Sequence, residues 1–312
     1  MDWSLSATAA LVIAALVVLV ATGAVVAWHS VVVMPYDLRV TEFDAALPGL
    51  GAELDGYAIV VVADLHHRPI DGDAYLRRVA GVVNGLAPDL VALLGDYGIS
   101  YKYAPRLSKW LYRRLFPGVE RFVAALVARD GIVAVLGNHD HYGGAAFTRA
   151  RLTAAGVRVL VNERIVLARG RARLYLGGVD DAEEGRVDPR GGVGDAPPDE
   201  PRLLLSHHPD GVLALDRCAR LDLVLSGHTH GGQVVLPLLG APITMSRVCD
   251  RRHPSGWVPN DVAPLYVSRG VGCQTPLRFR CPPEVLLVRL RAAPRDAGAA
   301  SGAAGGPAQQ ST

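Results

Sequence analysis

The sequence predicts an α/β domain that is tethered at its N-terminus by one apolar transmembrane helix. Three observations lead to this prediction. An uncharged apolar run near the N-terminus is long enough to span a membrane, strand-like runs alternate with helical segments over most of the remaining chain, and five of those runs end in metal-binding residue types. With 312 residues and no internal repeat, the chain can bury one large core or two modest ones.

The first predicted element is the membrane anchor, residues 1–28. Residues 5–27 read LSATAALVIAALVVLVATGAVVA and contain no charged residue, and Trp3 and Trp28 flank them. At about 1.5 Å per residue this run covers roughly 30 Å, the thickness of the hydrocarbon core of a bilayer. A cleaved signal peptide is the alternative. A retained anchor is favoured, because no Lys or Arg precedes the run and because it exceeds the apolar region of about 7–15 residues found in signal peptides.

Charge and cysteine content restrict the location and the partners of the protein. Arg39 is the only nearby cation on the domain side of the anchor, and it favours a cytoplasmic domain at the cell membrane. The formal net charge of +2 argues against a general nucleic-acid-binding surface, so no nucleic-acid partner is expected. The four cysteines form no CxxC pair and identify neither a zinc knuckle nor a redox compartment. They are Cys218, Cys249, Cys273 and Cys281.

A single α/β domain is predicted over residues 55–291, after an extended linker over residues 29–54. A helix over residues 74–87, with Asp73 as its N-cap, is expected between the first two strands. The tail, residues 292–312, consists of small and polar residues and is expected to be disordered. The strands are predicted from continuous apolar or β-branched runs. They cover residues 58–64, 89–96, 132–138, 174–181, 202–210, 221–230, 265–272 and 284–290.

Metal-binding side chains stand at the ends of five of the predicted strands. Functional groups of an open α/β sheet collect beyond the carboxyl ends of its strands, so these residues are expected to converge on one crevice. Each cluster alone could be a turn, a cap or a buried histidine, but five such endings together are poorly explained in that way. The clusters are Asp64-Leu65-His66, Gly95-Asp96, Gly137-Asn138-His139-Asp140, Ser206-His207-His208-Pro209-Asp210 and Ser226-Gly227-His228-Thr229-His230-Gly231-Gly232.

The residue types in these clusters indicate a mixed nitrogen and oxygen metal site. Asn138 is informative, because a neutral amide is an uncommon zinc ligand but donates oxygen in mixed-ligand sites. No cysteine occurs in any cluster, which argues against a closed structural zinc site. The set therefore suits a pair of hard or borderline divalent ions.

This ordered set of motifs resembles that of the calcineurin-like metallophosphoesterases, whose pattern is DxH, GD, GNHD or GNHE, H and GHxH. Within that family the chain is similar to a membrane-anchored branch whose bacterial members include lipid-linked pyrophosphohydrolases. The N-terminal span, the HxPD form at 207–210, GHTHGGQ at 227–233, SRGVG at 268–272 and PPEV at 282–285 all fit this branch. The resemblance implies a four-layer αββα sandwich of two mixed sheets. One departure is His67-Arg68-Pro69 after the DxH motif, where a small turn is common.

The resemblance also implies two divalent metal cofactors, Mn, Fe or Zn. One ion would be held by Asp64, His66, Asp96 and His230, and the other by Asp96, Asn138, His207 and His228. The metals would activate a water molecule for in-line attack on phosphorus. His139 would donate a proton to the leaving oxygen, and Asp140 would orient His139. His141 and His208 are interpreted as wall or surface histidines, because the ligand count is already full.

Residues 100–121 form a basic segment that bears on the substrate. The segment holds both lysines of the chain and four arginines against one acid, Glu120. Its apolar residues fall at helical spacing on one face, and they are Leu107, Trp110, Leu111 and Leu115. Two interpretations are open: an ordinary helix that packs this stripe on the domain, or an interfacial helix that meets anionic lipid.

The predicted function is that of a dinuclear metal-dependent phosphoesterase that hydrolyses a phosphodiester or pyrophosphate bond in a membrane-associated or lipid-linked substrate. A phosphodiesterase or phosphatase that acts on soluble substrates is the second reading. A catalytically silent, membrane-tethered binding module is the third, and it is disfavoured because degenerate domains usually lose ligands and none is missing here. The leaving group, the metal and the oligomeric state are left open.

Overall fold

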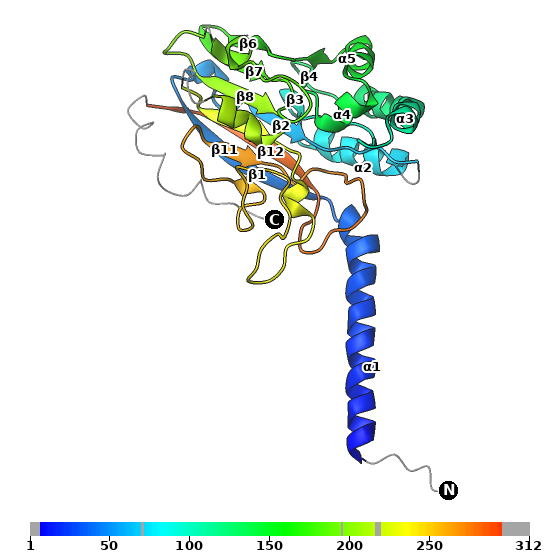
Figure 1. Ribbon diagram of the computed structural model, residues 1–312. Helices are drawn as coiled ribbons and strands as arrows, with labels where there is room; N and C mark the ends of the chain where they lie inside the picture. Colours follow the sequence, from blue (N-terminus) through cyan, green and yellow to red (C-terminus); the bar gives the residue numbers. More distant parts are fainter. Residues whose placement is uncertain (1–6, 70–71, 195, 216–219, 295–312) are drawn as a thin grey trace, which may run out of the picture.

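The computed structural model shows one long helix that leads into a domain of two stacked β-sheets (Figure 1). The structure describes residues 7–69, 72–194, 196–215 and 220–294. Residues 1–6 of the predicted anchor, and the predicted tail from residue 295 onward, lie outside these ranges.

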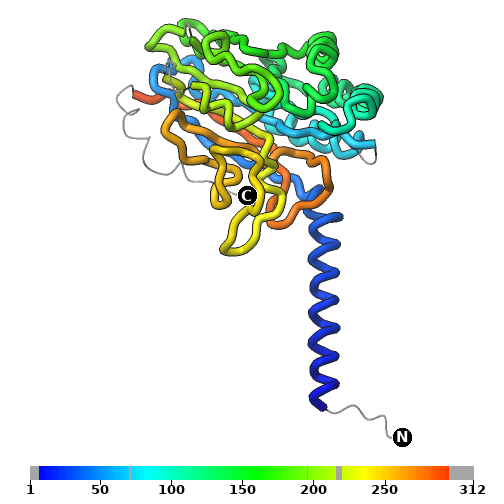
Figure 2. Tube along the Cα trace, viewed as in Figure 1, coloured from blue at the N-terminus to red at the C-terminus, as the bar shows by residue number. Residues whose placement is uncertain are grey.

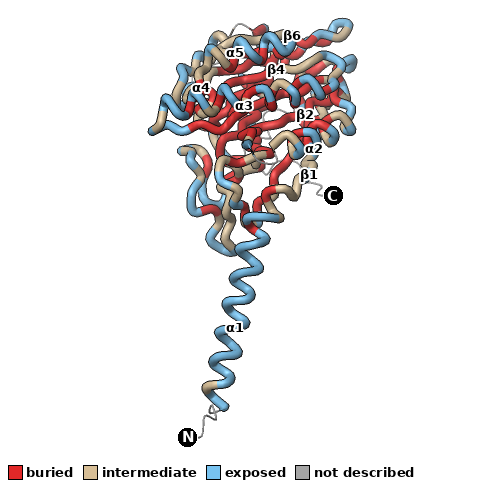
Figure 3. The backbone as a smooth tube through the Cα atoms, turned by 90° about the vertical axis from the view of Figure 1, so that its right-hand side faces the viewer, coloured by how far each residue is buried: buried red, intermediate tan, exposed pale blue. Residues whose placement is uncertain are grey.

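The N-terminal helix, α1 (Ala7–Trp28), continues through a π-helical turn (His29–Val33) and a 3₁₀ turn (Met34–Tyr36). Over Ala7–Tyr36 it is, by length and composition, the one helix within the described ranges that could cross a membrane. No residue of α1 is buried. Figure 3 shows it exposed along its length, in contrast to the buried interior of the domain.

The first sheet has the strand order β1-β12-β2-β3-β4-β5. Strands β2 to β5 run parallel, and β12 is antiparallel to β2 but parallel to β1. Every residue of β2 and β3 is buried, which is why these strands read as continuous apolar runs. The strands are β1 (Arg39–Pro48), β2 (Ala58–Val62), β3 (Leu90–Leu93), β4 (Ile132–Ala134), β5 (Arg158–Val159) and β12 (Glu284–Ala293).

The segment expected to be a linker, residues 29–54, contains an edge strand of this sheet instead. Strand β1 pairs in parallel with β12 along all 10 of its residues. Phe43, Ala45 and Leu47 are buried on its inner face, and polar or exposed residues alternate with them. The linker prediction is wrong here, because a strand that buries only one face lacks the continuous apolar run from which the other strands were predicted.

The second sheet has the strand order β10-β11-β9-β8-β7-β6, with four parallel inner strands and an antiparallel strand at each edge. Each predicted strand is present in one of the two sheets. Most stop earlier than expected, because the polar residues at their carboxyl ends leave the sheet. The strands are β6 (Glu163–Arg169), β7 (Ala172–Gly178), β8 (Arg202–Ser206), β9 (Leu223–Ser226), β10 (Gly256–Trp257) and β11 (Leu265–Val267).

The two sheets stack on one another, and the largest apolar cluster lies between them (Figures 1 and 2). A second cluster joins the outer face of the first sheet to helices α2 and α3. The two mixed sheets of an α/β fold are therefore as predicted. Over the second sheet, the described residues contribute a 3₁₀ turn (Pro209–Ala214) and a π-helical turn (Arg190–Gly194) rather than α-helices. The α-helices of the domain are α2 (Gly72–Gly85), α3 (Pro105–Ala125), α4 (Asn138–Gly143) and α5 (Ala145–Ala154).

Helix α3 contains most of the basic segment, and it packs through a different face from the predicted stripe. Tyr112, Phe116 and Val119 are buried against the domain. Leu107 and Trp110 are 57% and 60% exposed, so the interpretation that they pack on the domain is wrong. The hydroxyl of Tyr112, on this buried face, donates a hydrogen bond to the buried carboxylate of Asp140, which is described below. Whether the exposed face of α3 meets lipid stays a prediction.

Candidate metal centre

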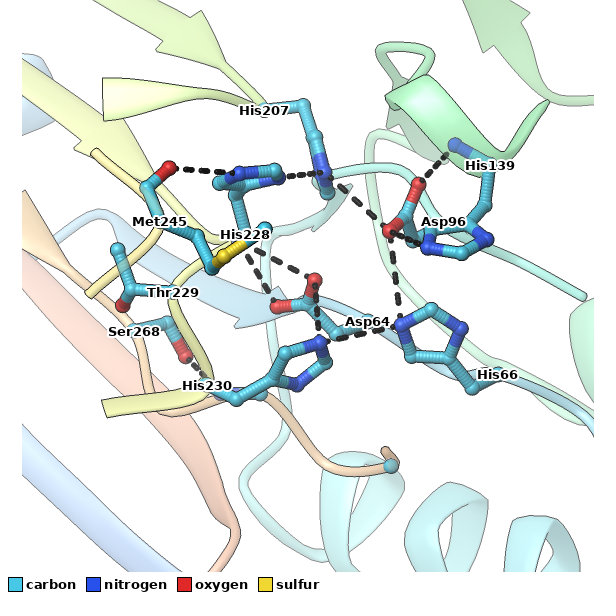
Figure 4. Close-up of polar contacts among 12 residues, drawn as sticks. Asp64, His66, Asp96, His139, His207, His228, Thr229, His230, Met245 and Ser268 are labelled. Atoms are coloured by element: carbon cyan, nitrogen blue, oxygen red, sulfur yellow. Dashed lines mark hydrogen bonds and ion pairs between the residues drawn. The ribbon is translucent and has the colours of Figure 1, made fainter. Parts of the chain in front are cut away.

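The five predicted clusters meet where strands of the two sheets end (Figure 4). The parallel strands of each sheet direct their carboxyl ends to the same edge, as expected for an α/β sheet. The seven predicted ligands follow these strands in order: Asp64 and His66 after β2, Asp96 after β3, Asn138 after β4, His207 after β8, and His228 and His230 after β9.

Asp64, His66 and His230 form the first group of candidate ligands. Their ligand atoms lie within 4.8 Å of one another. Nε2 of His66 is 3.2 Å from Nε2 of His230, and Oδ1 of Asp64 is 3.9 Å from Nε2 of His230. The Nδ1 atoms of both histidines are buried without a hydrogen-bond partner in the described part of the chain. A cation between the two Nε2 atoms would satisfy both of the lone pairs that face each other.

Asn138, His207 and His228 form a second group beside Asp96. Oδ1 of Asn138 lies 3.3 Å from Nε2 of His207 and 3.1 Å from Nδ1 of His228, and these two nitrogen atoms are 3.3 Å apart. Oδ2 of Asp96 lies 3.4 Å from Nε2 of His207. The group joins one amide oxygen, one carboxylate and two imidazoles, a donor set that suits a borderline divalent ion.

Asp96 lies between the two groups. Its Oδ2 is 3.5 Å from Nε2 of His66 in the first group and 3.4 Å from Nε2 of His207 in the second. Two atoms that bind the same divalent ion at about 2.1 Å, at angles near 90–110°, are roughly 3.0–3.4 Å apart. Most separations within each group are close to this range. The donors therefore fit two divalent ions that share Asp96.

The backbone at the site is held in an unusual conformation. Positive φ angles occur at five of the seven predicted ligands: Asp64 (57°), His66 (40°), Asp96 (57°), His228 (71°) and His230 (52°). Residues other than glycine rarely adopt such angles, which cost about 1–3 kcal/mol each. Buried hydrogen bonds hold them here. The N–H of His66 donates to the carbonyl of Asp96 over 2.9 Å, and the N–H of Asp64 donates to that of Gly95 over 3.1 Å.

Burial and mutual contact set the charges of the carboxylates and of His207. Burial raises the pKa of Asp64 to about 7. Burial acts in the same direction on Asp96, but the facing imidazoles of His207, His139 and His66 outweigh it and hold the pKa of Asp96 well below its usual range. Burial alone would lower the pKa of His207, but the charge of Asp96 outweighs it and raises that pKa well above its ordinary value.

The remaining ligand histidines are held neutral. Burial lowers the pKa of His66 and of His228 well below the ordinary value for histidine, and it lowers the pKa of His230 to about 3. A neutral imidazole is the form that coordinates a metal ion. Burial therefore favours the coordinating form of all three side chains.

Comparison with known proteins identifies the family. Residues 57–232 match the calcineurin-like phosphoesterase family. The chain belongs to the calcineurin-like phosphoesterases. It is 31% identical over 240 residues to phosphodiesterase YaeI of Escherichia coli, covering 75% of this chain and 82% of that protein. It is 27% identical over 307 residues to the UDP-2,3-diacylglucosamine pyrophosphatase LpxG of Chlamydia trachomatis, covering 82% of this chain and 90% of that protein.

Among solved structures, the phosphoesterase is similar to a dimetal phosphatase from Danio rerio, with 15% identity and a TM-score of 0.41 over 70% of this chain and 88% of that one. The family match and the relatives confirm the predicted family and the predicted enzyme class, a metal-dependent phosphoester hydrolase. The candidate ligand groups provide a place for the metal that this chemistry needs.

His139 of the phosphoesterase faces the site with one ring nitrogen. Its Nε2 is 4.0 Å from Oδ2 of Asp96, and its Nδ1 is 2.9 Å from the carbonyl oxygen of Ser100. Because a carbonyl only accepts, Nδ1 carries a proton, and Nε2 is left to exchange a proton within the site. His139 also lies close enough to His66 and Asp96 to share an ion with them, so its role as proton donor stays a prediction. Ser100 was not predicted.

Asp140 does not make the predicted contact. Its carboxylate accepts hydrogen bonds from the backbone N–H groups of Asp96 (2.9 Å), Tyr97 (3.0 Å) and Gly137 (2.8 Å), and from the hydroxyl of Tyr112 (2.7 Å). Within the described residues, none of its hydrogen bonds goes to a histidine ring. The prediction that Asp140 orients the proton donor is therefore corrected: four closer donors occupy both of its oxygens, and it holds the backbone of Asp96 instead.

The extra histidines have partners outside the two ligand groups. These partners are Asp73 for His67 (2.8 Å), Asp180 for His141 (2.9 Å) and the backbone N–H of Asp210 for His208 (3.1 Å). His208 could also share an ion with Glu183 and His228, but Glu183 is exposed and pairs with Lys102. Of the four cysteines, Cys218 lies outside the described residues; the other three, Cys249, Cys273 and Cys281, are buried free thiols.

Backbone carbonyls orient two of the ligand histidines. Nδ1 of His207 lies 2.6 Å from the carbonyl oxygen of Leu94, and Nε2 of His228 lies 3.1 Å from that of Met245. These contacts direct Nε2 of His207 and Nδ1 of His228 toward Asn138, and partners of this kind fix both tautomer and ring orientation. The sequence could not predict them, because a carbonyl contact carries no residue signature.

Arg278 connects a ligand to the end of the N-terminal helix. Its side chain is fully buried and donates from Nη1 to the carbonyl of His230 over 3.4 Å. Its backbone N–H donates to the carbonyl of Ser30 over 2.9 Å. One residue therefore contacts both the metal centre and the turn that follows α1.

Proposed function

We propose that this phosphoesterase hydrolyses a phosphodiester or pyrophosphate bond in a lipid-linked substrate while α1 anchors it in a membrane. The observation that carries the proposal is the position of the metal centre beside the end of α1. Pro35, in the turn after α1, lines a small cavity together with His66. Arg278 joins Ser30 to His230 in the same region. A substrate held in the membrane by its lipid part would present its phosphate near the candidate ligands.

The similarity to LpxG supports a lipid-linked substrate. That relative is named as a pyrophosphatase of UDP-2,3-diacylglucosamine, a pyrophosphate that carries acyl chains. The alignment of the two proteins covers 82% of this chain and 90% of LpxG. The phosphodiesterase YaeI is named without a lipid, so a soluble phosphodiester is the competing substrate class.

The roles of the residues follow from their positions. Asp64, His66, Asp96 and His230 would hold one divalent ion, and Asp96, Asn138, His207 and His228 the other; Mn, Fe and Zn all suit these donors. Such a pair, when bound, supplies an activated water molecule and stabilises negative charge on phosphoryl oxygens. His139, with Nδ1 held by Ser100, would give a proton from Nε2 to the leaving oxygen.

The proposal includes a cytoplasmic domain at the cell membrane. Arg39, on which the sequence-based orientation depended, is paired with Asp37 at 2.9 Å. Two further cations lie at this end of the anchor: Nη2 of Arg68 donates to the hydroxyl of Tyr36, and Nη1 of Arg78 donates to its carbonyl. Cations at the end of a span favour the cytoplasmic side. A protease should therefore digest the domain in inverted membrane vesicles and spare it in intact spheroplasts, and the reverse pattern would overturn this orientation.

A substrate comparison tests the proposed function. The full-length chain, purified in detergent without chelator, would be assayed with Mn²⁺ on UDP-2,3-diacylglucosamine and on a small chromogenic phosphodiester. We expect a higher kcat/KM for the lipid-linked substrate, and loss of both activities with chelator or in Asp96→Ala. Hydrolysis of the small diester alone would favour the soluble-substrate function. No hydrolysis of either substrate by metal-loaded protein would favour a silent binding module.

A further inference from the structure

An uncharged apolar hairpin projects from the second sheet on the side of the domain that α1 leaves. We define the hairpin as residues 234–246, which read VVLPLLGAPITMS. In Figures 1 and 2 the yellow chain of this region extends below the sheets, the direction in which α1 leaves the domain. Leu236 and Gly240 exchange backbone hydrogen bonds in both directions, so Leu238 stands at the tip of a closed turn.

Large apolar side chains of the hairpin are exposed together. Leu238 is fully exposed, and Leu239, Ile243 and Met245 are 57%, 65% and 67% exposed. Single exposed apolar residues are ordinary, but a contiguous group marks a surface that meets lipid, a ligand or another protein. Leu238 has a φ of 64°, which leucine rarely adopts. The closed turn thus holds the leucine at the tip against its own conformational preference.

Hydrogen bonds connect the hairpin to the end of α1 through one neighbouring segment. The N–H of Val235 donates to the carbonyl of Phe279, and the N–H of Phe279 donates to that of Gln233, over 3.0 and 2.8 Å. The adjacent Arg278 donates its N–H to the carbonyl of Ser30. Because α1 is long and apolar enough to cross a membrane, a lipid surface would lie at this end of the domain wherever α1 is inserted.

Cations follow the apolar tip. Arg247, Arg251 and Arg252 are exposed directly after the hairpin, and Arg280 is exposed on the neighbouring segment, against one exposed acid, Asp250. An apolar tip with cations behind it is the arrangement by which protein segments bind anionic membrane surfaces. The charge pattern therefore favours lipid over an apolar protein partner.

The far end of the hairpin reaches the metal centre. The carbonyl of Met245 lies 3.1 Å from Nε2 of His228, as Figure 4 shows. Thus Met245, whose carbonyl orients a candidate ligand, stands only 7 positions after the exposed tip at Leu238. A lipid chain held along this hairpin would have its head group directed toward the ligands.

We propose that residues 234–246 insert into the lipid surface beside α1 and contact the apolar part of the substrate, with Arg247, Arg251 and Arg252 at head-group phosphates. The second half of this proposal rests on the proposed function, because it takes the substrate from that surface. The proposal assigns the membrane contact to the hairpin rather than to α3, where residues 100–121 had suggested it.

Depth-dependent fluorescence quenching tests the insertion. Full-length Leu238→Trp and Ile243→Trp variants would be reconstituted in vesicles of phosphatidylcholine and phosphatidylglycerol that contain lipids brominated along the acyl chain. Val166→Trp is the matched control, because Val166 is an apolar residue, 43% exposed, on edge strand β6. We expect blue-shifted emission and loss of intensity for both hairpin variants relative to wild type, and neither change for the control. Both substitutions replace exposed side chains, so if one variant fails to fold, the other still tests the insertion.

The outcomes separate this inference from the proposed function, because quenching is measured without substrate. Absence of added quenching in both hairpin variants, in protein that still hydrolyses a lipid-linked substrate, would overturn the hairpin and leave the function in place. Quenching in protein that hydrolyses only soluble diesters would support the insertion and overturn the substrate contact. Quenching of the Val166→Trp control to the same degree would mean nonspecific adsorption and would also overturn the proposal.

Discussion

Asp140 offers a sharp test of how the site is held together, because it supports the backbone of Asp96, the candidate ligand that lies between the two groups. It is fully buried and accepts hydrogen bonds from the N–H groups of Asp96, Tyr97 and Gly137 and from the hydroxyl of Tyr112. Asp140→Ala would leave three buried backbone N–H groups unpaired, at about 1–3 kcal/mol each, whereas the hydroxyl of Tyr112 could still pair with Thr148. The sum, about 3–9 kcal/mol, is comparable to the whole stability of a typical domain, about 5–15 kcal/mol. We therefore expect the alanine variant not to fold.

Asp140→Asn is the informative perturbation. One amide oxygen keeps two of the four hydrogen bonds, and the amide nitrogen faces the other two donors. Loss of two hydrogen bonds to a charged group, at about 1.5–3 kcal/mol each, predicts a destabilisation of about 3–6 kcal/mol. Burial raises the pKa of Asp140 to about 6, which means that its charge is costly in the folded protein. Because the substitution removes this charge, we expect a destabilisation near the lower end of that range. Where the amide nitrogen takes the place of Oδ2, which accepts the N–H of Asp96, metal affinity should fall as well.

Thermal unfolding of the full-length protein in detergent, combined with metal analysis, measures both effects. Tyr112→Phe is the matched control: it removes the hydrogen bond to Asp140 and the contact with the hydroxyl of Thr148, and it leaves the three backbone contacts of Asp140. It should cost about 1.5–3 kcal/mol and keep the metal content of wild type. If Asp140→Asn kept wild-type stability and two metals but lost turnover, the structural role would be refuted, and the predicted role of orienting His139 would be restored.

Three further predictions concern the metal centre and α3. His139→Ala should keep both metals and lower turnover by about 10²–10⁴, less for good leaving groups, whereas Asp96→Ala should empty the site. Metal analysis together with the kinetics distinguishes a proton donor from a ligand, and metal loss in both variants would mean that His139 is a ligand. Metal binding should release protons, and affinity should rise with pH, because Asp96 raises the pKa of His207 and only neutral imidazole coordinates. Titration calorimetry in buffers of different protonation enthalpy measures this release, and buffer-independent heats would contradict it. Lys109→Gln combined with Arg114→Gln should leave hydrolysis of a lipid-linked substrate at the wild-type rate, and a selective loss on that substrate would return the membrane contact to α3.

The fold is predictable where strands are buried on both faces and less so at the edges of the sheets. Strands β2 and β3 are apolar at every position, so their sequences alone predict strands that are buried on both faces. Strand β1 buries one face and β6 only Leu167, and both were missed. Strands β5 and β10 have 2 residues each, too short for any periodicity. Edge strands depend on a neighbour that the local sequence does not contain.

A helical stripe likewise does not decide which face of α3 is buried. Leu107 and Trp110 lie on one apolar face, and Tyr112 and Phe116 lie on another. The buried face includes Tyr112, whose hydroxyl donates to Asp140, a residue distant in sequence. The candidate ligands were predictable because their chemistry is local to each motif. Their supporting contacts, through carbonyl and N–H groups of the backbone, depend on loop paths that exist only in the folded chain.

The left-handed backbone at the ligands shows why those supporting contacts matter. Positive φ at five ligands, at about 1–3 kcal/mol each, amounts to roughly 5–15 kcal/mol of strain. A cost of this size persists only if contacts outside the ligand set hold the loops. The carboxylate of Asp140 accepts the N–H of Asp96, and Arg278 donates to the carbonyl of His230. Relaxation of the loop at Asp96 would leave its buried N–H without the carboxylate of Asp140, and so would exchange backbone strain for an unsatisfied polar group. Contacts outside the ligand set therefore help to hold the candidate ligands facing one another.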